Sequence, residues 1–256
     1  MPAASASHVP PLPPLPPLPS LRERRRAAAT REILEAAESQ VTEHGPTALS
    51  LRAVARSLGM TVQALYHYFP SRDALLTALI TKAYDELATA VQTAADTTPP
   101  DSDLPRMVAA AEGYRRWAIE HPELFQLLYG TPLRQYEAPL GGPTTTAMSR
   151  MGEIFQRELF APFTHPQLAA AALPPLPPPL RAHPDHLPPG GVGDLPPPAI
   201  ALLMSAWGHM HGLVILEVFG HTAFIGDHQA GIFHLSMRNL IEDVHRRIPA
   251  LQDLPD

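Results

Sequence analysis

Nineteen of the 32 prolines in this 256-residue chain fall into two short segments, eight between Pro2 and Pro19 and eleven between Pro174 and Pro198. Because proline has no backbone N–H and a fixed φ, such runs adopt polyproline-like or disordered conformations and do not pack into helices or sheets. The other 13 prolines are spread at an ordinary frequency over a chain that is 45% hydrophobic. We therefore predict two appendages on a globular body, a disordered leader over 1–21 and a mobile loop over 174–198.

Outside these segments, apolar residues recur at helical spacing, and no alternating run is long enough for a sheet. The first helix is expected from about Arg26, with Ile33, Ala37 and Val41 on one face, and Gly45-Pro46 ends it. Further helices are expected over 51–58, 61–68, 71 to a linker at 97–100, 104–121, 122–129, 144–160, 199–220 and 227–247. The sequence predicts an all-α protein with an N-terminal three-helix helix-turn-helix head at 22–71, a larger helical body at 72–247 and a tail at 248–256.

Charge is divided unevenly along the chain. The net charge is −6, but the stretch from Ser20 to Arg72 holds eight Arg against five Glu, so this stretch carries +3 and the remainder −9. Four of these arginines, from Arg22 to Arg26, precede the expected first helix and resemble an arm that follows phosphates. A solvated helix start explains the same cluster equally well.

Several classes of protein are excluded by composition. With no cysteine, the chain has no disulfide framework, no Cys-ligated metal site and no thiol nucleophile. No Lys or Arg precedes Arg22 and no apolar run lies before it, so a secretory signal is not supported and a cytoplasmic location is expected. The one long apolar stretch, Ala199 to Gly220, is interrupted by Glu217 and two histidines. A buried helix explains that stretch better than a membrane span.

The nineteen residues from Leu51 have the spacing of two short crossed helices joined by a tight turn. Small Ala55 lets the helices approach, and Gly59 lies where the turn needs a positive φ. Ser50, Thr61 and Ser71 are expected to cap the helices that follow them. Apolar contacts between the two helices are expected from Val54, Leu58, Met60 and Leu65.

The residues after this turn, Thr61 to Arg72, read TVQALYHYFPSR. With REILEAA from Arg31 and LRAVA from Leu51, they resemble the DNA-binding domain of the TetR family of transcriptional regulators. The resemblance covers about Arg26 to Leu87. It implies a three-helix head that places the helix after Thr61 in the major groove of a double-stranded DNA operator.

The resemblance also implies which residues contact DNA, and their chemistry agrees. Gln63 can pair with adenine, Arg52 with guanine, and Val62 can touch a thymine methyl. Tyrosine hydroxyls and Arg72 can hold phosphate oxygens, although Tyr66 would serve equally as packing between helices. The matching positions are Ser50 and Arg52 in the second helix, Thr61, Val62, Gln63 and His67 in the recognition helix, and Tyr66, Tyr68 and Arg72 at phosphates; the basic cluster adds Arg25 and Arg26.

A second resemblance lies in the body, where Trp207, His211 and Gly212 look like the Trp-x-x-x-His-Gly signature of TetR C-terminal domains of the WHG type. Trp207 and His211 are four residues apart and share a helix face. The aromatic residues of the body have two explanations, ordinary core or the wall of a pocket for a largely apolar small molecule. The candidate ligand-binding residues are Tyr114, Trp117, Phe125, Tyr129, Met204, Trp207 and His211.

Metal and catalytic sites have little support in the sequence. His209 and His211 are two apart and point to different sides of a helix, and His183, Asp185 and His186 fall in the Pro-rich loop. There is no Gly-rich phosphate loop, no Gly-x-Ser-x-Gly turn and no paired acid and base. We therefore expect no metal, no cofactor and no enzymatic activity.

Two functions remain. The first is a homodimeric regulator, more often a repressor, that binds a palindromic operator and is released by a small-molecule effector. Its dimer interface is expected on the last two helices, through Leu203, Val214, Val218, Ile232, Leu235 and Leu240. The second is an architectural or partner-recruiting protein with no effector, in which the body only dimerises.

Overall fold

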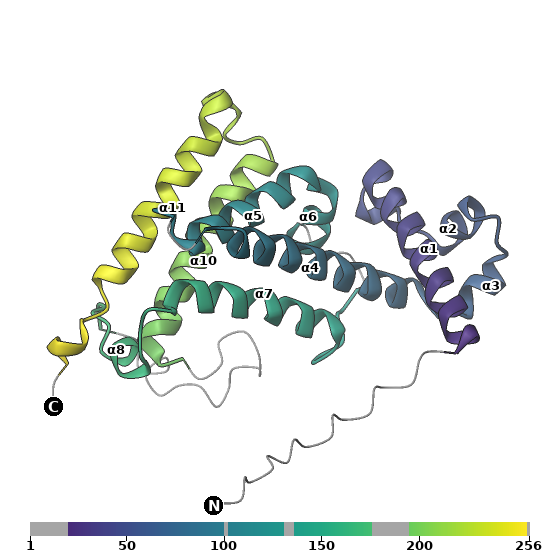
Figure 1. Cartoon of the computed structure of the whole chain (residues 1–256). Helices are drawn as coiled ribbons and strands as arrows, with labels where there is room; N and C mark the ends of the chain where they lie inside the picture. Colours follow the sequence, from purple (N-terminus) through teal and green to yellow (C-terminus); the bar gives the residue numbers. More distant parts are fainter. Residues whose placement is uncertain (1–19, 100–101, 131–135, 176–194, 255–256) are drawn as a thin grey trace, which may run out of the picture.

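The computed structural model describes residues 20–99, 102–130, 136–175 and 195–254 (Figure 1). Within these ranges all regular structure is helical, which confirms the all-α prediction. The leader up to residue 19 and residues 176–194 of the Pro-rich loop lie outside the described residues, and with them the histidines expected near Asp185.

The head consists of α1 (Leu21–His44), the short 3-10 turn η1 (Pro46–Ala48), α2 (Leu51–Ser57) and α3 (Val62–Tyr66). Its centre is apolar, since Ile33, Val41, Val54 and Leu65 are all completely buried. The turn between α2 and α3 uses Gly59 at φ 64°, as the spacing predicted.

The first helix begins earlier than predicted, at Leu21 and not near Arg26. Ser20 caps it: the Ser20 hydroxyl accepts from the Glu23 N–H at 3.2 Å, and the Glu23 carboxylate accepts from the Ser20 N–H at 2.7 Å. The Arg22 to Arg26 cluster is therefore the exposed first turns of α1 and not an extended arm.

The long helix α4 (Arg72–Asp96) runs from the head into the body. Ser71 caps it, since its hydroxyl accepts from the Ala74 N–H at 3.0 Å. Three helices cover α4: α5 (Arg106–Glu120), α6 (Pro122–Tyr129) and α7 (Pro143–Phe160). A Cβ at Gly113 of α5 would lie 2.6 Å from the Ala94 Cβ, so this close approach of α5 to α4 requires glycine.

The C-terminal part of the body holds α8 (His165–Ala169), α10 (Pro197–Val218), η2 (Ala223–His228), α11 (Gln229–Arg246) and η3 (Leu251–Asp253). Leu195 and Pro196 are buried and α10 starts at Pro197, so the predicted loop extended too far at its end. Helix α10 is long and apolar enough to cross a membrane, with a mean hydropathy of 1.6, but in this fold it packs against α5, α8 and α11.

Candidate DNA interface and ligand-binding body

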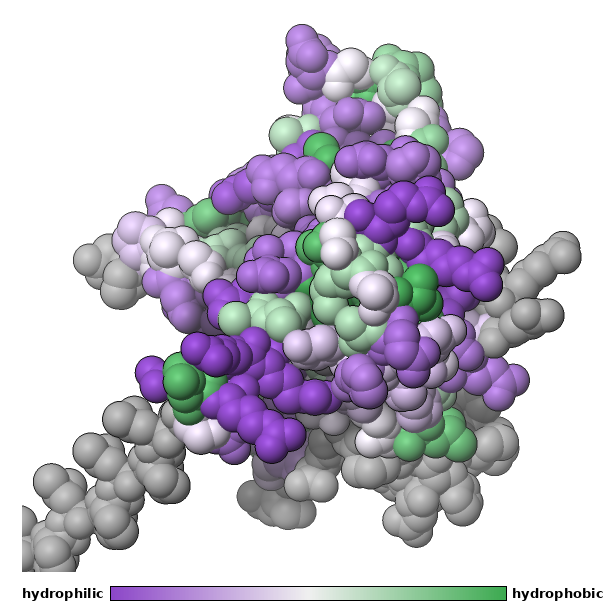
Figure 2. Space-filling view, turned by 90° about the vertical axis from the view of Figure 1, so that its right-hand side faces the viewer, coloured by the Kyte–Doolittle hydropathy of each residue, from purple (hydrophilic) through white to green (hydrophobic). Residues whose placement is uncertain are grey.

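The recognition helix α3 turns one side inward and leaves the other in solvent. Leu65 is completely buried, whereas Gln63, Tyr66 and His67 are exposed, and the Tyr66 side chain is 44% exposed. The Thr61 hydroxyl accepts from the Ala64 N–H at 3.1 Å and so fixes the start of the helix. The head faces the viewer in Figure 2, where hydrophilic side chains surround a smaller hydrophobic area.

Three further residues predicted to contact DNA have structural partners inside the head. The Arg26 Nη2 donates to the His67 carbonyl oxygen at 3.1 Å, and its guanidinium lies 5.3 Å from the centre of the Tyr68 ring. The Arg72 Nε donates to the Leu49 carbonyl oxygen at 2.9 Å. Arg26 therefore ties the start of α1 to the end of α3, and Arg72 ties α4 to the segment before α2.

The other predicted contact residues differ in exposure. Arg25 and Arg52 are exposed, while Val62 and Ser50 are half-buried. Ser50 precedes α2, but its hydroxyl makes no capping bond, contrary to prediction; its N–H donates to the Gln40 Oε1 at 3.3 Å.

In the body, an aromatic cluster lies around a buried polar contact. The Tyr114 hydroxyl lies 2.7 Å from the His211 Nδ1, and Tyr114 is completely buried. The Trp207 ring stacks on the His211 ring, with centres 5.1 Å and planes 11° apart. Phe125 and Tyr129 also pack on His211, with ring centres 5.8 and 4.5 Å from it. Five of the seven predicted ligand-binding residues are therefore in one cluster.

Trp117 does not belong to this cluster, contrary to prediction. It packs on His121, with ring centres 5.1 Å apart, and lines a separate groove with Lys82 and Ala90. Residues three apart on a helix differ by about 60° in direction, and here that angle separates Trp117 from Tyr114.

Beside the cluster is a hollow of about 240 Å³, here called the tryptophan hollow. Met204, which is 50% exposed, lines this hollow together with Trp207. Its lining residues come from α6, α7 and α10 and are all uncharged: Tyr129, Met148, Ser149, Met151, Gly152, Phe155, Leu203, Met204 and Trp207.

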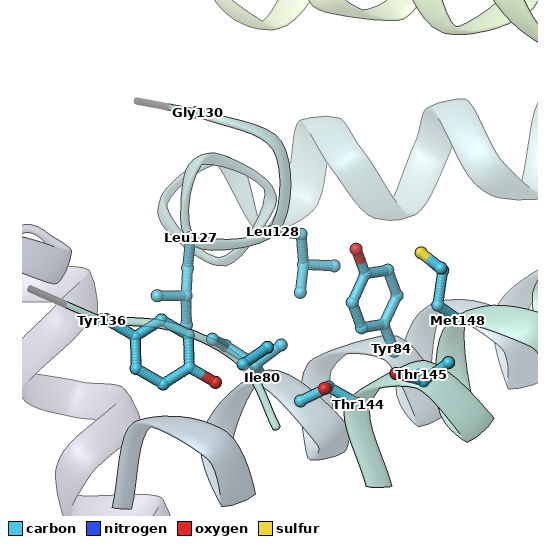
Figure 3. A pocket seen from close by; sticks show the side chains of 10 residues that line it. Ile80, Tyr84, Leu127, Leu128, Gly130, Tyr136, Thr144, Thr145 and Met148 are labelled. Carbon is cyan, nitrogen blue, oxygen red and sulfur yellow. The ribbon is translucent and has the colours of Figure 1, made fainter. Parts of the chain in front are cut away.

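A second hollow of about 370 Å³ was not predicted from the sequence (Figure 3). We call it the head-side hollow. Its lining residues are Ile80, Tyr84, Leu127, Leu128, Gly130, Tyr136, Ala138, Thr144, Thr145 and Met148. Figure 3 shows Leu127 and Leu128 entering from α6, opposite Tyr84 on α4 and Thr144 on α7. No sequence pattern brings these residues together, because they come from helices that are distant in the chain.

Besides α4, which runs through both parts, further contacts join the body to the head. The Lys82 Nζ on α4 lies 2.5 Å from the Glu38 Oε2 on α1 and 2.6 Å from the Glu86 Oε1. Burial alone would lower the pKa of Lys82, but the bonds to both carboxylates outweigh it and raise that pKa. Helix α6 packs on α1 and η1, so the helix that lines the head-side hollow also touches the head.

The outer face of α10 and α11 carries exposed apolar side chains. Ile232 is 46% and Leu235 59% exposed, while Leu203 and Val214, also predicted for the interface, are buried in the protomer's own core. Val218 and Leu240 are half-buried. Leu216, Phe219 and Phe224 extend the exposed apolar face.

The two histidines of α10 point to different sides, as the spacing predicted. The His209 Nε2 lies 2.8 Å from the Ser236 hydroxyl on α11, whereas His211 faces the aromatic cluster. In the part of the chain that the structure describes, no three His, Asp or Glu side chains are placed to hold a metal ion.

A three-helix head with an exposed, capped α3, joined by α4 to a larger helical body, defines a helix-turn-helix DNA-binding protein with a regulatory domain. Residues 33–79 match the family model of the tetR family of bacterial regulatory proteins, and residues 107–240 match that of the tetracyclin repressor-like C-terminal domain. The chain belongs to the TetR family of transcriptional regulators, which are not enzymes.

Similar proteins agree with this assignment. The HTH-type transcriptional regulator Rv1816 of Mycobacterium tuberculosis is 42% identical over 124 residues, which are 48% of this chain and 53% of that protein. The match thus spans about half the length of this relative. The crystal structure of SCO4313, described as a regulatory protein, is 29% identical with a TM-score of 0.68 and covers 87% of this chain and 100% of that one. A TetR variant of Acinetobacter baumannii in complex with minocycline shares the fold at 18% identity and a TM-score of 0.50, over 85% of this chain and 97% of that one.

Proposed function

We propose that this protein is a cytoplasmic repressor that binds a palindromic operator as a homodimer and leaves it when a largely apolar small molecule binds the body. The observation that supports this proposal most directly is that α4 is one unbroken helix, from Arg72 in the head to Asp96 in the body. Its first residues belong to the head, and its middle residues Ile80 and Tyr84 line the head-side hollow. A molecule bound in the head-side hollow would therefore contact the same helix that connects the body to the head.

Two further contacts support coupling between body and head. Lys82 joins α4 to α1 through Glu38, and α6 packs on both α1 and η1. A ligand that prefers a conformer with badly spaced heads by about 1 to 3 kcal/mol weakens operator binding 5- to 150-fold, and DNA weakens ligand binding equally.

The exposed apolar face of α10 and α11 supports a dimer. Two-fold symmetry would place two α3 helices about 34 Å apart, or a multiple of it, to meet successive major grooves. Large exposed apolar faces of this kind are typical of protein interfaces.

The aromatic cluster supports a ligand site of the predicted kind. The A. baumannii TetR variant, which shares this fold, is in complex with a small molecule, minocycline. The stacking of Trp207 on His211 supports the narrower inference that the body belongs to the WHG type.

The test begins with genome-wide mapping of bound sites in the source organism, which identifies the operator and the regulated genes. Metabolites related to those genes are then added to the protein on its operator, and fluorescence anisotropy reports release. Release by one compound class supports the proposal. An operator complex unaffected by every such compound favours the effector-free architectural function.

A further inference from the structure

The polar groups of the head-side hollow include a buried threonine hydroxyl that has no partner among the described residues. Thr144 is 5% exposed and lines the hollow, and its hydroxyl makes no hydrogen bond to any residue that the structure describes. Helix α7 starts at the same place, with Pro143 and no side-chain cap, so the Thr144 and Thr145 N–H groups are further donors. A buried hydroxyl without a partner is costly, which points to a ligand atom that accepts its hydrogen.

Tyr84 adds a third donor to this hollow. Its hydroxyl is directed toward Leu128 in Figure 3. Burial raises the pKa of the Tyr84 phenol, so the hydroxyl stays protonated at neutral pH. The Tyr136 hydroxyl is already paired with the Thr77 hydroxyl at 3.1 Å.

The two hollows adjoin one another. Met148 lines both, and the Tyr84 and Tyr129 rings, one from each hollow, pack edge to face with centres 5.9 Å apart. Beyond Met148 the wall is apolar and aromatic as far as Trp207. The donors therefore lie on the head side of Met148, and the far side is largely apolar.

Among the residues that the structure describes, those that line the two hollows are all uncharged. A carboxylate or ammonium group would be buried there without an opposite charge, at high cost. The helix start of α7 favours an anion only weakly by comparison.

We propose that the two hollows form one site for an uncharged, elongated, apolar molecule with a carbonyl oxygen at one end, which accepts from Thr144 while the chain passes Met148 to Trp207. This inference rests on the proposed function, because it specifies the effector class of that regulator.

The test uses straight-chain methyl ketones, from hexanone to tetradecanone, as probes. In a Trp117→Phe background Trp207 is the one remaining tryptophan, and its emission reports when a probe reaches the far hollow. Thr144→Val removes the buried hydroxyl with little change in shape, and Thr144→Ser retains it. Thr146→Val is the matched control, since Thr146 is exposed and its hydroxyl faces the Gly142 carbonyl oxygen.

We expect the longer ketones to change Trp207 emission and Thr144→Val to weaken their binding about tenfold, the effect of one lost buried hydrogen bond. Thr144→Ser and Thr146→Val should bind as the wild type does, and decanoate should bind more weakly than methyl octyl ketone. Unchanged emission with all ketones, equal loss in both valine variants, or tighter binding of decanoate overturns the proposal.

Operator release is measured separately, so the two proposals fail in different ways. If ketone binding depends on Thr144 but the operator complex stays intact, the ligand site is supported, and its role as the effector site is refuted. If a compound releases the operator but binds the Thr144→Val variant as tightly as the wild type, the regulatory function is supported and this ligand site is refuted.

Discussion

Arg26 on the first helix donates a hydrogen bond of 3.1 Å to the backbone carbonyl of His67, at the end of the recognition helix. Helix α3 is only five residues long. Arg26 therefore links the position of α3 to that of α1, whether or not it also reaches a phosphate.

We expect Arg26→Ala to reduce the preference for operator over random DNA, because α3 loses a tether and its base contacts become less well aligned. Its neighbour Arg25 is exposed and provides the control. If Arg25 contacts a phosphate, Arg25→Ala should weaken binding to all duplexes alike. It should also lower the slope of log affinity against log salt concentration by about 1. Binding isotherms at several salt concentrations separate these results. An Arg26→Ala variant that behaves like Arg25→Ala would show that Arg26 is only a phosphate contact.

The burial of His211 predicts a pH dependence of stability. Burial lowers the pKa of His211 below its ordinary value of 6.5, so the unfolded chain binds the proton more readily than the folded protein. This contribution is fully present above the unfolded pKa and is lost as the pH falls through and below 6.5. Urea unfolding between about pH 8 and pH 5 should therefore show a smaller loss of stability in His211→Asn than in the wild type. An identical pH dependence in both proteins would contradict this.

Substitutions at two leucines of the C-terminal helices should affect different properties, dimerisation in one case and protomer stability in the other. Leu235 is 59% exposed, so Leu235→Asp should leave the protomer folded but give monomers at micromolar concentration in analytical ultracentrifugation. Leu203 is buried, so Leu203→Ala should lower the free energy of unfolding by about 2 to 5 kcal/mol through the cavity it leaves. A wild-type monomer, or a dimer that tolerates Leu235→Asp, would refute the interface.

The fold could be predicted because each helix of the head carries its own signals. Gly59 at positive φ, the caps at Thr61 and Ser71, and the spacing of buried residues are local features that determine local structure. The start of α1 was misplaced although Ser20 and Glu23 form a capping box, because the proline-rich leader and the basic cluster suggested an extended segment.

The body was harder to predict because α10 is apolar on nearly every side. Periodicity then does not distinguish Leu203 and Val214, which face the protomer's core, from residues that face outward. The head-side hollow depends on contacts between α4, α6 and α7, which are distant in sequence, so Tyr84 and Thr144 carry no pattern that brings them together.

The central claim is that α3 reads a specific DNA sequence, and Gln63 tests it most directly, since it is exposed on α3 with an amide that can pair with adenine. The measurement is the ratio of affinities for the mapped operator and a scrambled duplex, in the wild type, Gln63→Ala and Tyr66→Phe. We predict that Gln63→Ala lowers this discrimination by about 1 to 3 kcal/mol, while Tyr66→Phe weakens both duplexes alike. A wild type that binds both duplexes equally, or a Gln63→Ala variant with full discrimination, would contradict the account.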